Sequence, residues 1–194
     1  MVNNPMIRLG AAIMGVAVAL TVTGCTSGPS RGPRPGMMGD GGYRYSRLTC
    51  AAPTDLPGLV VTVVLADMGM SRMVGGTASP GARMMLHAAP ATVAAGQVSF
   101  VAQNMGWRTH ELVVLPLASG TAGLRVPGMD GKVDETGSLG EASADCAAGT
   151  GDGIPAGAVG WVTLTLPPGT YEIVCNLTNH YADGMYQRLT VLST

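Results

Sequence analysis

From residue 59 to the C-terminus, the chain is a series of short hydrophobic stretches separated by Gly, Pro and Asp. Several stretches alternate between apolar and polar residues and are rich in β-branched side chains. This pattern is typical of β-strands, and no stretch shows a convincing helical period. We expect about seven to eight strands, drawn from residues 59–65, 83–87, 91–94, 97–104, 110–117, 160–166, 170–175 and 186–192. Short strands with turn signals between them favour an all-β fold, a β-sandwich.

One interval in this pattern is much longer than the others. Residues 118–158 are rich in Gly, Asp and Ala and show little pattern. Loops longer than about 12–15 residues are uncommon inside a compact domain unless they have a function of their own. We therefore expect this segment either to serve a function or to be fixed in place by another part of the chain.

The N-terminus has the features of an export signal. A polar start with one basic residue, Arg8, precedes an uncharged stretch at residues 9–22, which is shorter than the roughly 20 apolar residues of a membrane-spanning helix. The stretch ends in Val22-Thr23-Gly24-Cys25, which resembles the lipobox of bacterial lipoproteins. We expect residues 1–24 to be a lipoprotein signal peptide and Cys25 to become the lipidated first residue. The alternative is an ordinary secretory signal that happens to contain a cysteine.

A linker separates this signal from the strand-rich region. Residues 25–49 are rich in Gly, Pro and Ser and contain too few apolar residues to form a core. The linker is basic, whereas residues 50–194 carry more acidic than basic side chains. A basic tether would suit anionic lipid headgroups, although its arginines would equally serve to keep a linker soluble. The sequence thus predicts a signal peptide, a flexible tether and one domain at residues 50–194.

Composition argues against several classes of protein. Of 194 residues, 12% are charged and 46% are hydrophobic, and 11 basic and 12 acidic side chains give a formal net charge of −1. So few charges with no basic excess argue against a nucleic-acid-binding protein and against an acidic disordered chain. The 29 Gly and 13 Pro are scattered without a collagen period, which agrees with a turn-rich β protein.

Near the C-terminus, three side chains that bind soft metals follow one another in the pattern Cys-x4-His-x4-Met. Cys175 ends one strand-like stretch, His180 and Met185 follow, and the next stretch begins directly afterwards. A second histidine, His110, opens an earlier stretch. One thiolate, two imidazoles and a weak thioether are the ligand set of blue copper sites. Zinc does not choose a thioether, and an iron–sulfur cluster needs more thiolates.

With these residues the chain resembles the cupredoxins, which are single-domain type 1 copper proteins. The spacing of the ligand loop is similar to the rusticyanin and sulfocyanin type and longer than that of plastocyanin. The resemblance covers roughly residues 56–194 and implies a cupredoxin-like Greek-key β-sandwich with one type 1 copper. It implies His110, Cys175 and His180 as equatorial ligands and Met185 as the axial ligand. It also implies that His180 lies near the surface, where electrons would enter.

Two positions depart from the common pattern of this family. Thr178 and Asn179 stand before the loop histidine, where members with this spacing often have Pro-Gly. Because asparagine tolerates the left-handed backbone conformation, the same turn can form. Glu111 follows the first histidine, where a small polar residue commonly ties the ligand loops together, and the sequence leaves open whether Glu111 does the same.

The two remaining cysteines suggest a disulfide. If Cys25 carries lipid and Cys175 binds copper, Cys50 and Cys146 are left, and an exported protein can join them. Such a bond would fix the long 118–158 segment to the start of the domain. The alternative makes Cys175 itself half of a disulfide, with His180 and Met185 as ordinary loop residues.

The third histidine and a group of methionines have simple interpretations. We expect His87, at the end of a strand-like stretch, to be an ordinary surface or core residue. Met68, Met70 and Met73 are expected to fill irregular apolar space, although they could also form a thioether site for Cu(I).

Together these features predict a lipid-anchored electron carrier. We expect a monomer, exported and held on the outer face of the cell membrane or in the periplasm, that passes single electrons between redox protein partners. No nucleic acid and no small-molecule substrate is expected. The alternative is a lipoprotein that binds and delivers copper without redox turnover. We expect no enzyme, because multicopper oxidases and nitrite reductases need further histidines, including His-x-His pairs, and this chain has three histidines in all.

Overall fold

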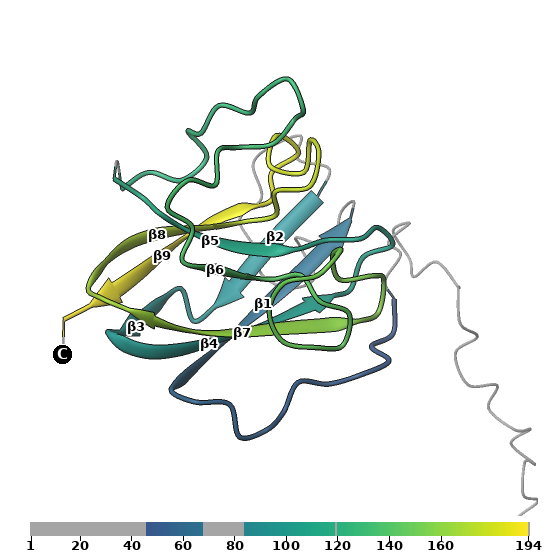
Figure 1. The fold of residues 1–194 in the computed structure, drawn as a ribbon, viewed down its shortest axis with the longest axis horizontal. Coiled ribbons are helices and arrows are strands. Elements are labelled where there is room, and N and C mark those ends of the chain that lie inside the picture. Colours follow the sequence, from purple (N-terminus) through teal and green to yellow (C-terminus); the bar gives the residue numbers. More distant parts are fainter. Residues whose placement is uncertain (1–45, 68–83, 119, 194) are drawn as a thin grey trace, which may run out of the picture. The chain divides into compact units, whose positions relative to one another are not determined.

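The computed structural model describes residues 46–67, 84–118 and 120–193. The expected signal peptide, Cys25, most of the tether and the methionines Met68, Met70 and Met73 lie outside the described residues, so the expectations for them remain predictions. The described residues form nine strands and no helix (Figure 1). Among them there is accordingly no helix with the length and hydrophobicity to cross a membrane.

The nine strands form two sheets. One sheet has the order β2-β1-β4-β7 and consists of β1 (Leu59–Asp67), β2 (Met84–Ala89), β4 (Gly96–Asn104) and β7 (Val159–Leu166). The other has the order β3-β9-β8-β5-β6 and consists of β3 (Thr92–Ala94), β5 (Leu112–Pro116), β6 (Gly140–Ala142), β8 (Gly169–Val174) and β9 (Tyr186–Leu192). Neighbouring strands are antiparallel, except that β1 runs parallel to β4 and β3 runs parallel to β9.

Alternation along the strands explains how the two sheets share a core. On β1, Val61, Val63 and Leu65 are fully buried. Val60, the second residue of the strand, is 46% exposed. Because successive side chains of a strand point to opposite faces, β1 directs one apolar row inward. The cluster that this row joins also contains residues of the other sheet, among them Ile173 of β8. The all-β sandwich expected from the sequence is therefore confirmed.

The number of strands differs from the expectation. The sequence pattern predicted about seven to eight, whereas the described residues form nine, and the additional strand is β6. It lies inside the 118–158 interval, and its three residues, Gly-Glu-Ala, include no β-branched side chain. It is a strand because it pairs with β5, where Leu112 faces Ala142. Tertiary pairing overrides local propensity here. The other strands match the expected stretches to within a few residues.

A disulfide between Cys50 and Cys146 fixes the long segment to the start of the domain. The S–S distance is 2.07 Å, and the bond joins positions 96 residues apart. The expected pairing is thus present. The thiol of Cys175 is free and buried, so the alternative in which Cys175 is half of a disulfide is wrong.

A buried glutamate holds the beginning of the same segment. The carboxylate of Glu172 on β8 is fully buried; its Oε1 accepts hydrogen bonds from the amide of Gly123 at 2.6 Å and the hydroxyl of Tyr181 at 3.0 Å. Its Oε2 forms an ion pair with Nε of Arg125 at 2.6 Å. A buried carboxylate requires such partners. Because Tyr181 directly follows the candidate ligand His180, these bonds connect the segment to the ligand loop.

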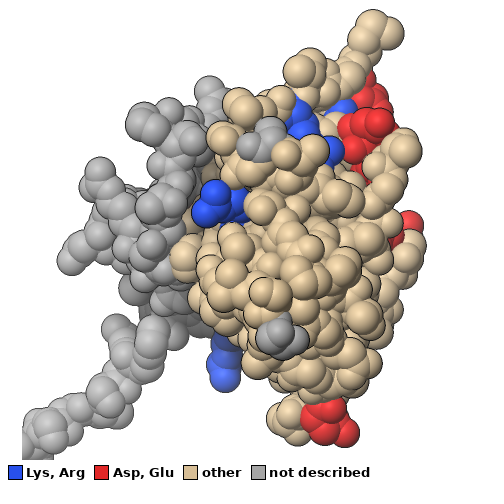
Figure 2. Space-filling view, turned by 90° about the vertical axis from the view of Figure 1, so that its left-hand side faces the viewer, with Lys and Arg blue, Asp and Glu red and all other residues tan. Residues whose placement is uncertain are grey.

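The surface is poor in charge, and part of it is apolar. On the face drawn in Figure 2, most of the described surface carries neither basic nor acidic side chains. Large apolar side chains are exposed in the segment that Glu172 holds, namely those of Leu124, Val126 and Met129. Single exposed apolar residues are ordinary, but several in one short segment are typical of a contact surface.

Candidate metal centre

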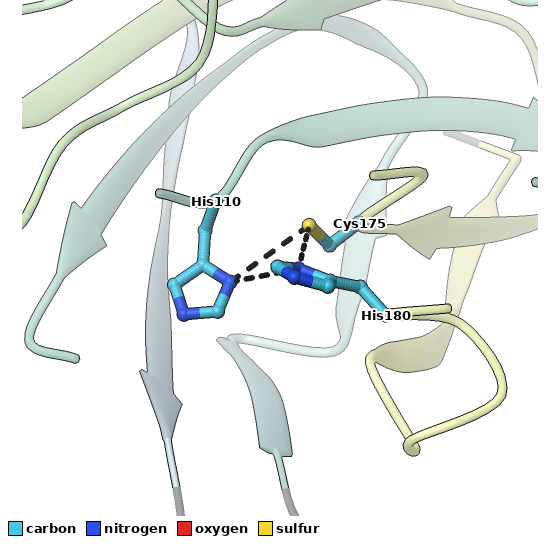
Figure 3. A group of neighbouring side chains, drawn as sticks. All are labelled: His110, Cys175 and His180. Atoms are coloured by element: carbon cyan, nitrogen blue, oxygen red, sulfur yellow. Dashed lines mark hydrogen bonds between the residues drawn. The ribbon is translucent and has the colours of Figure 1, made fainter. Parts of the chain in front are cut away.

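Three possible ligand atoms from two separate parts of the chain meet at one place (Figure 3). The Nδ1 of His110 lies 3.2 Å from the Nδ1 of His180 and 3.9 Å from the Sγ of Cys175. The Nδ1 of His180 lies 3.2 Å from the same Sγ. Atoms at these separations can all be within about 2.0–2.3 Å of one ion, which are the bond lengths of nitrogen and sulfur to a first-row metal. The structure therefore brings together the three residues that the resemblance implied as equatorial ligands.

His110 is held in the core by its backbone. It lies just before β5, where its amide donates to the carbonyl of Ile154 at 3.0 Å and its carbonyl accepts from the amide of Ile154 at 2.7 Å. Both residues are fully buried. This two-way bridge fixes the position of the histidine where the regular strand has not yet begun.

Cys175, His180 and Met185 lie on one loop between β8 and β9. The amide of Cys175 donates to the carbonyl of Met185 at 3.0 Å, and the amide of Met185 donates to the carbonyl of His180 at 3.1 Å. These bonds fold the loop so that its three donor residues lie close together. The side chain of Met185 is fully buried in the core cluster that also contains Cys175, a position near the grouping that suits an axial ligand.

Asn179 makes the turn that the family commonly makes with Pro-Gly. Its φ of 66° is left-handed, a conformation that asparagine tolerates better than most residues. Its amide donates to the carbonyl of Gly131 at 2.9 Å, and its carbonyl accepts from the amide of Asp183 at 3.0 Å. The turn expected at this position is thus present without proline or glycine.

Glu111 joins the two parts of the chain that carry the ligands. Its amide donates to the Sγ of Cys175 at 3.3 Å, and its Oε1 accepts from the amide of Asn176 at 3.0 Å. The link that the sequence left open is therefore made by a glutamate. Burial, together with the negative charges of Glu135 and Glu141, raises the pKa of Glu111 to about 7.

Burial also sets the protonation of the ligands in the metal-free protein. It raises the pKa of the Cys175 thiol to about 12, and burial together with the nearby His110 lowers the pKa of His180 to about 4. At neutral pH the ring of His180 is therefore neutral and has a free lone pair, whereas the thiol keeps its proton. A metal cation that binds here must displace that proton, as metal ligands generally require.

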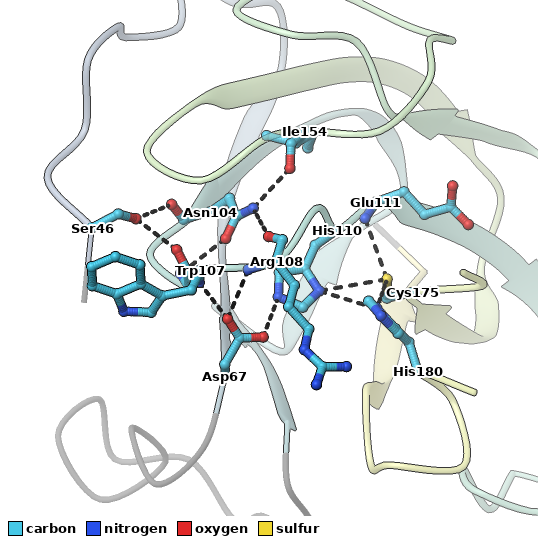
Figure 4. Close-up of polar contacts among 11 residues, drawn as sticks. Ser46, Asp67, Asn104, Trp107, Arg108, His110, Glu111, Ile154, Cys175 and His180 are labelled. Carbon is cyan, nitrogen blue, oxygen red and sulfur yellow. Dashed lines mark hydrogen bonds and ion pairs between the residues drawn. The ribbon is translucent and has the colours of Figure 1, made fainter. Parts of the chain in front are cut away.

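Asp67, at the end of β1, contacts this group although no sequence pattern pointed to it (Figure 4). Its Oδ1 lies 3.0 Å from the Nε2 of His110. Its Oδ2 accepts hydrogen bonds from the amide of Trp107 and, at 2.9 Å, from the amide of Arg108. Burial by itself would raise the pKa of Asp67, but the hydrogen bonds, led by that of His110, outweigh it and lower the pKa to about 2. The carboxylate is therefore ionised.

The two histidines differ in their access to the surface. His110 is fully buried, whereas 8% of His180 is exposed. This agrees with the position near the surface that the resemblance implied for His180. The third histidine, His87, lies half-buried in β2 opposite Val64 and is not part of the grouping, as expected.

The donor set fits a type 1 copper ion. Two imidazole nitrogens and a thiol surround one point, and a buried thioether lies on the same loop. Imidazole and thiolate suit Cu(II), and soft thiolate and thioether sulfur suit Cu(I). Among the described residues, the side chains grouped closely enough to bind a metal ion are His110, Cys175 and His180.

No family model matches this chain, and no curated protein matches its sequence. Among solved structures, auracyanin B is 20% identical over 77% of this chain and 99% of its own length, with a TM-score of 0.44. Auracyanin A, a "blue" copper protein from the green thermophilic photosynthetic bacterium Chloroflexus aurantiacus, is 19% identical over 68% of this chain and 98% of its own length, with a TM-score of 0.40. Rusticyanin from Thiobacillus ferrooxidans is 25% identical over 70% of this chain and 79% of its own length, with a TM-score of 0.37.

The chain's own fold and donor grouping are the features that matter for its classification. It has two β-sheets around one core, and its cysteine and two histidines converge from the positions that the sequence motif indicated. The β-sandwich and the grouping of His110, Cys175 and His180 confirm the resemblance of this chain to the cupredoxins.

Proposed function

We propose that this chain is a type 1 copper protein that carries single electrons between redox partners. The observation that carries the proposal is the approach of the Nδ1 atoms of His110 and His180 and the Sγ of Cys175 to within 3.2–3.9 Å of one another. Copper held by these atoms, with Met185 as a weak axial ligand, would take up and release one electron.

The protein's own contacts support this function because they hold the ligands in place. The backbone bridge to Ile154 positions His110, and the amide of Glu111 is directed at the sulfur of Cys175. Two further backbone bonds fold the loop that carries His180 and Met185. Ligands that are fixed by such contacts need to move little when the metal changes its oxidation state, which favours rapid electron transfer.

The surface beside His180 supports docking of a redox protein there. The amide of Arg125 donates to the hydroxyl of Tyr181 at 3.1 Å, and the amide of Asn179 donates to the carbonyl of Gly131 at 2.9 Å. The intervening segment is thus bonded to the residues on either side of His180. It exposes Val126 and Met129, and Leu124 directly before it is exposed as well. Apolar residues on a segment that is bonded to both neighbours of the more exposed histidine suit brief contacts with another protein, and we propose that electrons enter there.

We also propose that the domain is exported and held at a membrane by lipid on Cys25. The disulfide between Cys50 and Cys146 supports export, because such bonds persist in oxidising compartments. Two or more acyl chains would give stable attachment, which a single chain would not. Mass spectrometry of the mature N-terminus tests this proposal: a lipidated Cys25 is expected, and an unmodified Cys25 or cleavage elsewhere would contradict it.

Electrochemistry combined with a chelator challenge distinguishes electron transfer from copper delivery. The copper-loaded chain is cycled repeatedly between the two oxidation states, and the reduced form is then exposed to a Cu(I) chelator. An electron carrier should show a reversible wave and keep its copper through both treatments. Ready loss of Cu(I) to the chelator, without a reversible wave, would instead indicate a copper-delivery protein. Cys175→Ser, which removes the thiolate, is the control. It should show neither the reversible wave nor the retention of copper.

A further inference from the structure

We infer that Asp67 is a positioning residue that fixes His110 in the tautomer required for metal binding. The inference rests on the proposed copper site. It concerns a contact that lies behind His110, on the side of the ring that faces away from Cys175 and His180 (Figure 4).

The two nitrogens of the His110 ring have different partners. Nδ1 faces the Sγ of Cys175 and the Nδ1 of His180, whereas Nε2 lies 3.0 Å from the Oδ1 of Asp67. A neutral imidazole carries one proton, on one of its two nitrogens. Asp67 already acts as an acceptor, because its Oδ2 receives hydrogen bonds from two backbone amides, so Nε2 is the nitrogen that donates to Oδ1. The lone pair of Nδ1 is then directed toward the place where the metal would bind.

Asp67 is itself held by the segment that leads to His110. Its Oδ2 accepts from the amides of Trp107 and Arg108, so the carboxylate cannot rotate away from the ring without losing both bonds. The carbonyl of Arg108 in turn accepts from the Nδ2 of Asn104 at 2.7 Å, and Asn104 is fully buried. Asp67 and Asn104 together therefore hold the segment before His110.

The contact gives the two histidines different electronic character. A carboxylate hydrogen-bonded to the far nitrogen of a ligating imidazole makes that imidazole a stronger donor. Within the described residues, no carboxylate makes such a hydrogen bond to His180, whose Nδ1 contacts are with His110 and Cys175. Asp67 should therefore favour Cu(II) over Cu(I) through His110 and lower the reduction potential.

The first test uses the metal-free chain, so its outcome does not depend on copper. Nitrogen NMR shifts of His110 show which ring nitrogen carries the proton, and we expect Nε2 in the unmodified chain. In Asp67→Asn the amide oxygen should stay with the two backbone donors, which turns the NH2 group toward Nε2 and moves the ring proton to Nδ1. A proton on Nδ1 in the unmodified chain, or an unchanged tautomer in folded Asp67→Asn, would overturn the inference. If Asp67→Asn does not fold, the unmodified chain decides.

The second test measures metal binding and potential. We expect Asp67→Asn to bind Zn(II) about 10–100-fold more weakly, the usual cost of losing such a partner, and to show a higher reduction potential when loaded with copper. Asp183→Asn is the matched control, because it removes a negative charge that acts on His180 without a hydrogen bond to either ring. Equal effects of the two variants would overturn the positioning role, since charge alone would explain them. Failure of the unmodified chain to bind copper would count against the proposed function and leave the tautomer result to decide on Asp67.

Discussion

The amide nitrogen of Glu111 donates a hydrogen bond to the Sγ of Cys175 at 3.3 Å, across a separation of 64 positions in the chain. In the reverse direction, the carboxylate of Glu111 accepts from the amide of Asn176 at 3.0 Å. One residue thus fixes the distance between the two segments that carry His110 and Cys175. An amide directed at the sulfur also favours the thiolate form that a metal requires.

Removal of the acceptor at position 111 should loosen the ligand loop. Glu111→Ala leaves the buried amide of Asn176 without its side-chain acceptor, which we expect to cost about 1–3 kcal/mol of stability and to speed copper loss to a chelator. Glu111→Gln keeps an acceptor oxygen at the same place and should resemble the unmodified chain. Denaturant unfolding of the metal-free variants measures the effect. An equal loss in both variants would show that the hydrogen bond is not responsible.

Met185→Leu should keep the blue colour and raise the reduction potential. The colour depends on the thiolate of Cys175, which this change leaves in place, and leucine fits the fully buried site of Met185. Loss of the weak sulfur donor should destabilise Cu(II) relative to Cu(I) and move the potential upward. Voltammetry of the copper-loaded variant tests this, and a potential that stays the same or falls would argue against Met185 as a ligand.

The left-handed turn at Asn179 should tolerate glycine but not a β-branched residue. Asn179→Gly should be close to neutral, whereas Asn179→Val should cost about 1–2 kcal/mol, because φ is 66° there. Thr178→Val places the same side chain at the neighbouring exposed position, where φ is not positive, and serves as the control. Thermal unfolding of the three variants gives the comparison, and similar stability of the two valine variants would be inconsistent with this prediction.

Removal of the disulfide should lower stability and leave the metal site intact. The bond closes a loop of 96 positions, and loss of a native disulfide typically costs about 2–5 kcal/mol. The double variant Cys50→Ala, Cys146→Ala should therefore unfold at lower denaturant concentration, with its blue absorption unchanged while it is folded. Loss of the colour in the folded variant would mean that the bond also shapes the copper site.

The sequence predicted those parts of the fold that depend on local pattern. Alternation of apolar and polar residues located β1, β4 and most other strands, because each strand buries one row of side chains in the shared core. The ligand loop could also be predicted from the sequence, because Cys175, His180 and Met185 lie close together in it and have distinctive chemistry.

The parts of the fold and of the candidate site that the sequence did not predict depend on tertiary pairing. β6 has no strand-forming residues and exists only through its register with β5. Asp67 meets His110 because β1 runs parallel to β4, with Leu65 opposite Asn104, so that the end of β1 reaches the residues that follow β4. No local pattern encodes that register. At Glu111 the sequence identified the position, but its role required the contact with Asn176 to be seen.

A copper titration of the purified chain, followed by visible absorption together with metal analysis, tests most directly whether His110, Cys175 and His180 hold a copper ion. Cu(II) should produce an intense blue charge-transfer band that grows until one copper is bound per chain. Cys175→Ser should not produce this band, because the thiolate that donates the charge is absent. A colourless Cu(II) complex of the unmodified chain, or the same blue band in Cys175→Ser, would contradict the account.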